Sequence, residues 1–230
     1  MSAVGHLCSR FLESHPAEAV RILERHPADA VVHILATQTP AAVAAILQAS
    51  LPINGATYLS HMPHDQMVEA IQNLDSEHTI RLLRHQHPKQ REALLNALPE
   101  RVSKGYRRLL HYAEHCVGAY MNPFIFVLAT GTSVAEATQR VHQQDTDSQF
   151  YPFVVDHEQQ LVGVLTVSDL IRASPKTHLE DIMKKDVVRL SAYATMDDIR
   201  KITGRGAFHS LPVLDVDGTL IGVIDQDGLK

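Results

Sequence analysis

The chain has 230 residues, 45% of them hydrophobic and 20% charged, so it is long enough for two ordinary domains with packed cores. Its formal net charge is −5: residues 1–115 balance 11 basic with 11 acidic side chains, whereas residues 116–230 hold 10 and 15. An acidic balance and the lack of Trp argue against a nucleic-acid partner, and no apolar stretch nears the roughly 20 residues that span a bilayer. The start shows no secretory signal, and Cys8 and Cys116 form no spaced pair, so we expect a cytoplasmic protein.

The first half contains an internal repeat of 11 to 13 residues. Each repeat begins at a proline or, in one case, at Asp75. The prolines are Pro16, Pro27, Pro40, Pro52, Pro63, Pro88 and Pro99. Proline is accepted in the first turn of a helix, where its missing N–H would have no intrahelical partner. Each repeat therefore predicts one short helix.

Apolar pairs recur near the ends of these helices and predict a shared core. The pairs are Ile22-Leu23, Ile34-Leu35, Ile46-Leu47, Leu82-Leu83 and Leu94-Leu95. A helix of this length is marginal alone, so its neighbours must stack on it. We expect an α-solenoid of short helices, right- or left-wound, over residues 1–115, which presents a surface to a partner. Ser14, Thr39, Ser50 and Asp75 are the predicted helix caps, and residues 101–112 are predicted to form the last helix.

The second half contains a sequence pattern that recurs about sixty residues further along the chain. YPFVVD at 151–156 and LVGVL at 161–165 return as LPVLD at 211–215 and LIGVI at 220–224. Each copy predicts two strands joined by a hairpin. A strand at 126–128 and helices from 134 and 168 complete the first unit, and residues 187–190 and a helix at 196–202 belong to the second. Met121 and Met183 occupy the same place in the two openings.

This doubled β-α-β-β-α pattern resembles a tandem pair of cystathionine-β-synthase (CBS) domains, a Bateman module, at residues 116–175 and 176–230. The fold class is therefore α followed by α/β. Residues 163–169, GVLTVSD, fit the G-h-x-[ST]-x-x-D pattern of that family. The resemblance implies that Thr166 and Ser168 face a phosphate and Asp169 the ribose of an adenine nucleotide (ATP, ADP or AMP). Tyr151 and Phe208 stand just before the hairpin strands, where their rings would stack on adenine.

The two copies differ where the ligand would bind. Asp225 replaces the hydroxyl residue and Gly228 the ribose carboxylate, which predicts one competent nucleotide site rather than two. The alternative for the first copy is that Asp169 merely caps a helix.

The order of the two halves resembles the cytosolic portion of the MgtE family of magnesium transporters. The junction at 112–121, YAEHCVGAYM, is similar to that family's Y-P-E-[DE]-[ST]-A-G-x-[LM]-M and keeps Tyr112, Glu114, Gly118 and Met121. The repeats HPAEAVRIL and HPADAVVHIL are also similar to that family. The resemblance implies a dimeric regulatory module that senses Mg²⁺ and adenine nucleotide and gates a membrane transporter domain, in cis or in trans.

Carboxylates are the oxygen ligands that Mg²⁺ prefers. The candidate ligands are Asp197, Asp198, Asp225 and Asp227. The alternative for Asp197 and Asp198 is a pair of first-turn acids that complement a helix dipole. As part of a longer transporter, the chain would lie at the cytosolic face of the inner membrane, with a homodimer formed through the CBS pair.

A second functional hypothesis is a freestanding CBS-pair sensor of adenine nucleotides, whose helical array docks on a separate partner protein. No Ser/His/Asp order, carboxylate pair or phosphate loop with a catalytic Lys stands out in the sequence, so we predict that the protein is not an enzyme.

Overall fold

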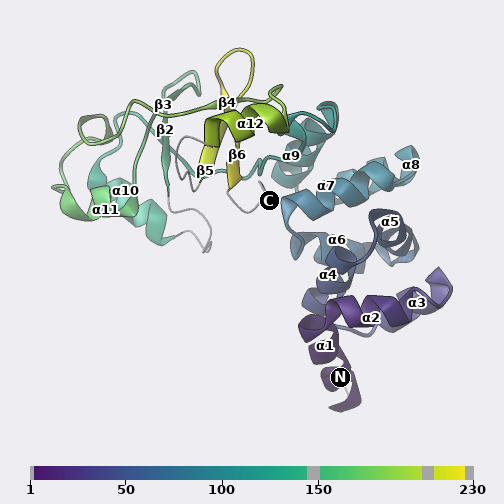
Figure 1. Ribbon diagram of the computed structural model, residues 1–230. Helices are drawn as coiled ribbons and strands as arrows, with labels where there is room; N and C mark the ends of the chain where they lie inside the picture. The colour runs from purple at the N-terminus through teal and green to yellow at the C-terminus, as the bar shows by residue number, and fades with distance from the viewer. Residues whose placement is uncertain (1–2, 144–150, 204–209, 226–230) are drawn as a thin grey trace. The chain divides into compact units, whose positions relative to one another are not determined.

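The computed structural model of the protein describes residues 3–143, 151–203 and 210–225 and divides the chain into two compact units, Met1–Leu110 and His111–Lys230. The first unit is an array of short helices that follow one another along the chain (Figure 1). They are α1 (Ala3–Ser14), α2 (Pro16–Leu23), α3 (Ala28–Leu35), α4 (Pro40–Ala49), α5 (Pro52–His61), α6 (His64–Gln72), α7 (Ser76–His85), α8 (Pro88–Ala97) and α9 (Glu100–His111).

Every member of the proline repeat stands at a helix start, which confirms the predicted helical array. Proline is the first helical residue of α2, α4, α5 and α8. Pro27 and Pro63 are the N-cap residues of α3 and α6, and Pro99 directly precedes α9. Asp75 is the N-cap of α7. The repeat thus sets the helix starts because a proline ring fits a first turn but not a helix interior.

Two of the four predicted caps are confirmed and two are wrong. The side chains of Thr39 and Asp75 accept hydrogen bonds from the N–H groups of Ala42 and His78. Ser14 instead is the last residue of α1, and Ser50 is the C-cap of α4, where its hydroxyl donates to the carbonyl of Ile46 at 2.7 Å. In both cases the residue after the serine is the N-cap of the next helix: His15 for α2 and Leu51 for α5.

The helices pack mainly on their second neighbours, so that α2 contacts α4, α3 contacts α5, α4 contacts α6 and α5 contacts α7, while α1 packs on its third neighbour α4. Amide side chains bind across these layers: Gln66 donates to the carbonyl of Leu35 at 2.9 Å, and Gln86 to that of Ala56 at 2.7 Å. The second residue of each apolar pair is buried, whereas Ile22 is 55% and Ile34 38% exposed. The core is therefore narrower than the sequence pattern suggests.

A histidine and an aspartate form an ion pair at the start of α7. The ring Nδ1 of His78 lies 2.8 Å from Oδ2 of Asp75, whose Oδ1 accepts from the His78 N–H at 2.7 Å. The hydrogen bond to Asp75 raises the pKa of His78 above its ordinary value of 6.5. Burial alone would raise the pKa of Asp75, but the hydrogen bonds from His78 outweigh burial and lower it.

We expect His78→Gln to cost more stability at acidic than at alkaline pH. Because the folded-state pKa of His78 is raised, its contribution is full below the unfolded pKa and is lost as the pH rises through the folded pKa. Asp75 stays ionised throughout this window, since its pKa is lowered. Urea unfolding should show a loss larger by about 0.5 kcal/mol at about pH 5.5 than at about pH 8.5. An equal loss of unfolding free energy at both pH values would contradict an ion pair between His78 and Asp75. His85→Gln is the matched control, because within the described residues the ring of His85 bonds the carbonyl of Arg81 and no carboxylate.

The second unit holds two small mixed sheets of the same design, which confirms the predicted β-α-β-β order in both repeats; a closing helix is described in the first, and the residues after Asp225 lie outside the described ranges. In each sheet the first strand is parallel to the second, which forms an antiparallel hairpin with the third. The first sheet and its helices are β1 (Val127–Ala129), α10 (Val134–His142), β2 (Phe153–Val155), β3 (Leu161–Val164) and α11 (Val167–Arg172). The second are β4 (Leu190–Ser191), α12 (Met196–Thr203), β5 (Ser210–Leu214) and β6 (Leu220–Asp225). The short 3₁₀ helices η1 (Val117–Ala119) and η2 (Leu179–Asp181) lie in the two openings.

Within the second unit, the segment that precedes each sheet pairs with the sheet of the other repeat; we call these two segments the openings, and the one after η2 the exchanged segment. Lys184, which follows η2, forms a two-way backbone bridge with Val164 of β3: its N–H donates to the Val164 carbonyl at 2.9 Å and its carbonyl accepts at 3.0 Å. Asn122, which follows η1, bridges Val223 of β6 in the same way, at 2.7 and 3.0 Å. Each opening is thus bound to the sheet of the other unit.

Candidate nucleotide pocket

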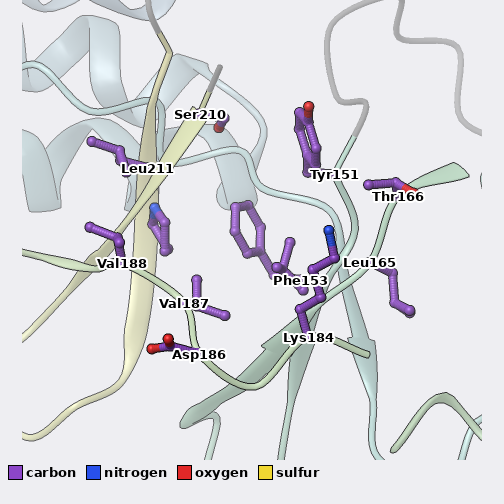
Figure 2. A pocket seen from close by; sticks show the side chains of 12 residues that line it. Tyr151, Phe153, Leu165, Thr166, Lys184, Asp186, Val187, Val188, Ser210 and Leu211 are labelled. Carbon is purple, nitrogen blue, oxygen red and sulfur yellow. The ribbon is translucent and has the colours of Figure 1, made fainter. Parts of the chain in front are cut away.

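A cavity of about 280 Å³ lies where the first sheet, the second sheet and the exchanged segment after η2 meet (Figure 2). Its walls are mostly apolar, with polar groups at a few positions, as is usual for small-molecule sites. The lining residues are Tyr151, Phe153, Val164, Leu165, Thr166, Lys184, Asp186, Val187, Val188, Ser210, Leu211 and Pro212. The volume is close to the lower end of the range for ligand pockets, so it suits the base and sugar of one nucleotide.

Thr166 and Asp169 form a reciprocal cap at the start of α11. Oδ2 of Asp169 accepts from the N–H of Thr166 at 2.8 Å and from its hydroxyl at 2.7 Å, while the Asp169 N–H donates to Thr166 Oγ1 at 3.1 Å. The hydrogen bond from the Thr166 side chain is the main cause of the lowered pKa of Asp169. The carboxylate is therefore held ionised against Thr166, which lines the pocket although Asp169 itself does not, and the second carboxylate oxygen makes none of these bonds.

The predicted nucleotide residues are only partly brought together. Tyr151 and Thr166 line the cavity, and Asp169 is bonded to Thr166. Ser168 is exposed in the first turn of α11 and is not a lining residue. Phe208 lies outside the described residues.

Sequence reasoning missed the wall that comes from the exchanged segment: Lys184, Asp186, Val187 and Val188. It assigned residues 187–190 to the second unit and so away from Thr166. The equivalence of Met121 and Met183 marked the two openings as a pair, but only the bridges across the sheets show where the openings go. Ser210 and Leu211 of β5 close the pocket from the second sheet.

The predicted metal ligands are engaged with neighbouring side chains. Asp197 pairs with Arg200 at 2.9 Å, and both acids lie in the first turn of α12. Asp198 accepts from the N–H of Thr195 at 3.0 Å and pairs with Lys201 at 3.2 Å. The backbone hydrogen bond from Thr195 is the main reason why the pKa of Asp198 falls to about 2.

The other two predicted ligands lie at the end of the chain. Asp225 ends β6 opposite Ser210, and Asp227 lies outside the described residues. Within the described ranges, no three His, Cys, Asp or Glu side chains are grouped as metal ligands would be.

Comparisons with known proteins match both halves of the chain. The MgtE intracellular N domain family matches residues 14–115, and the CBS domain family matches residues 117–176 and 179–229. The magnesium transporter MgtE of Thermus thermophilus is 28% identical over 155 residues, which cover 66% of this chain and 34% of the transporter. MgtE of Enterococcus faecalis is 30% identical over 125 residues, which cover 54% and 28%. The matched part thus spans about a third of these relatives.

Solved structures resemble the chain over almost its whole length. The crystal structure of the cytosolic domain of the Mg²⁺ channel MgtE in complex with ATP has a TM-score of 0.82 and 25% identity, and the match covers 96% of this chain and 92% of that one. The soluble part of a magnesium transporter has the same fold, with a TM-score of 0.66, 20% identity and coverage of 97% and 94%.

Across the described residues, no helix has both the length and the apolar character needed to cross a membrane. The match that covers almost the whole chain is to the cytosolic part of a magnesium transporter and not to an enzyme. An MgtE intracellular N domain is followed here by two CBS domains, in a chain that matches the cytosolic domain of the Mg²⁺ channel MgtE over 96% of its length.

Proposed function

We propose that this chain is the regulatory module of an MgtE-like magnesium transporter and that it binds an adenine nucleotide in the cavity between its CBS domains. The observation that carries the proposal is the cavity itself, which joins an apolar wall to Tyr151, Thr166 and Lys184. The ATP complex of the structural neighbour supports the choice of nucleotide. In this assignment the module comprises the helical domain at 1–115 and CBS domains at 116–175 and 176–230.

In this proposal, different residues of the site recognise the base and the ribose of the nucleotide. The ring of Tyr151 stacks on the base, and Val187 and Val188 exclude water from its other edge. The cap between Thr166 and Asp169 leaves one carboxylate oxygen to accept from a ribose hydroxyl, as the sequence motif implied. Ser168 and Phe208 remain candidates for the phosphate and the base.

We expect Tyr151→Ala to weaken ATP binding by about tenfold, since stacking of one base on an aromatic side chain contributes roughly 1–3 kcal/mol. Isothermal titration calorimetry of the whole chain measures the effect. Tyr193→Ala is the matched control, because Tyr193 is 56% exposed, contacts Tyr112 and does not line the cavity. No heat of binding for ATP with the wild-type chain would contradict the proposed function.

We also propose that Mg²⁺ acts on this module, with Asp197, Asp198, Asp225 and Asp227 as candidate ligands. The match to the MgtE intracellular N domain family and the excess of acidic residues in the second half of the chain support this part. Asp197 and Asp198 would have to exchange Arg200 and Lys201 for the ion. Bound Mg²⁺ would offset repulsion between acidic faces and favour one arrangement of the module over another. A Mg²⁺ titration followed by limited proteolysis tests this, and unchanged cleavage through millimolar ion would contradict it.

The remaining assignments concern location and assembly. We propose that the module acts at the cytosolic face of the membrane, as a homodimer formed through its CBS domains and coupled to a membrane transporter domain. The match to a cytosolic domain of MgtE supports this location. Light scattering measures the mass in solution, and a monomer at all concentrations would contradict the dimer.

A further inference from the structure

We infer that Lys184 binds the phosphate of the nucleotide and makes the cavity selective for phosphorylated nucleosides over free nucleosides. This inference rests on the proposed nucleotide function and adds a specific chemical class and a residue that the sequence motif does not contain.

Lys184 supplies the positive charge of the pocket wall. It is the one Lys or Arg among the described lining residues, and Asp186 is the other charged residue there. In Figure 2 the ammonium end of Lys184 points toward the side of the cavity where Tyr151 and Thr166 lie. Among the parts of the chain that the structure describes, no carboxylate forms an ion pair with this ammonium. The carboxylate of Asp169 feels this charge, because Lys184 adds to the hydrogen bonds from Thr166 in lowering the pKa of Asp169. A bound phosphate would therefore share the ammonium with Asp169.

The backbone fixes Lys184 next to the capped start of α11. Its N–H and carbonyl both bond Val164, and Val164 stands two residues before Thr166 on the same strand and turn. The two polar groups therefore come from segments that are bridged to each other. A phosphate beside them would receive a charge-assisted hydrogen bond from Lys184, which is about twice as strong as a neutral one.

The other half of the fold provides an internal comparison. Asn122 occupies the place of Lys184, because it forms the same two-way bridge with Val223 that Lys184 forms with Val164. Two residues beyond Val223 stands Asp225, where the first copy has Thr166.

The first half thus pairs a cation with a hydroxyl, whereas the second pairs a neutral amide with a carboxylate. Both differences make the second half less favourable for a phosphate, because Asn122 carries no positive charge and the carboxylate of Asp225 would repel an anion. Lys184 therefore supplies the donor for a phosphate in the first half, since the hydroxyl and N–H of Thr166 already donate to Asp169.

The exposure of the Lys184 side chain indicates that it serves ligand binding and not the packing of the fold. The side chain of Lys184 is exposed, and its bonds to β3 are made by its backbone. Replacing the side chain should leave the fold intact and change only the recognition of the ligand. Lys185 is exposed next to it but does not line the cavity, so it is a matched control for charge.

The test is calorimetry of the whole chain with ATP, AMP and adenosine in magnesium-free buffer, on wild type, Lys184→Asn, Lys184→Arg and Lys185→Ala. We expect Lys184→Asn to weaken ATP and AMP by roughly tenfold or more and adenosine by less than about twofold. Lys184→Arg should recover much of the loss, and Lys185→Ala should bind as wild type does. Thermal unfolding checks that each variant is folded.

Two outcomes overturn the inference and are distinct from each other. If wild type binds ATP but Lys184→Asn keeps the full preference for ATP over adenosine, or loses both ligands equally, Lys184 does not bind the phosphate. If wild type binds none of the three ligands, the proposed nucleotide function fails, and the role of Lys184 fails with it.

Discussion

Replacing Gly163 with valine is expected to weaken ATP binding at least tenfold and to lower the free energy of unfolding by about 1–3 kcal/mol. A Cβ atom at Gly163 would lie 2.5 Å from Sδ of Met183 and 3.1 Å from the carbonyl oxygen of Lys184. Valine would therefore push the exchanged segment away from β3. Because that segment carries Lys184, Asp186 and Val188, the wall of the cavity would move with it.

Gly222→Val is the matched control for this substitution. Its Cβ would lie 2.6 Å from Sδ of Met121 and 2.9 Å from the carbonyl oxygen of Asn122, so the steric conflict is of the same kind. The displaced segment does not line the cavity, and we expect a similar loss of stability with a much smaller loss of ATP affinity. Urea unfolding and calorimetry measure the two effects. Equal affinities for wild type and Gly163→Val would show that the exchanged segment does not form the binding wall.

Leu35→Ala is expected to destabilise the helical array by about 2–5 kcal/mol, because truncating a fully buried leucine removes apolar contacts and leaves a cavity. Leu35 is 0% exposed and belongs to the core of the first unit. Ile34 precedes it in the same helix and is 38% exposed, so Ile34→Ala should cost only about 1 kcal/mol or less. Urea unfolding followed by far-ultraviolet circular dichroism compares the two variants.

The pair of substitutions also tests whether the two units are energetically separate. The second unit has its own clusters of buried residues around Val154 and Phe153. We therefore expect Leu35→Ala to leave ATP affinity unchanged under conditions in which the chain remains folded. Similar losses of stability for Leu35→Ala and Ile34→Ala would contradict the assignment of the core.

Much of the fold was predictable because its signals are local. A proline at a helix start is a property of one residue and its own turn, and the strands of a hairpin are adjacent in the sequence. The same reasoning was wrong for Ser14 and Ser50, since a hydroxyl near a helix boundary serves either the end of one helix or the start of the next.

The candidate site was less predictable because two of its walls come from distant segments. The motif at 163–169 pointed to Thr166 and Asp169, and the structure places their cap at the edge of a cavity. The motif contains neither Lys184 nor Ser210. The sequence placed both in the second repeat, away from Thr166.

The sequence alone determined that an array of helices, each started by a proline or Asp75, precedes two similar β-α-β-β-α units. It also showed that the second unit has Asp225 at the position where the first has Thr166. Periodicity and residue type suffice for such conclusions because they depend on neighbouring residues. Only the tertiary structure decided that each opening segment binds the sheet of the other unit, which brings Lys184 beside Thr166 and leaves Asn122 beside Asp225. Pairing of this kind depends on which exposed strand edge each segment can reach in the folded unit, and no pattern within a single repeat encodes it.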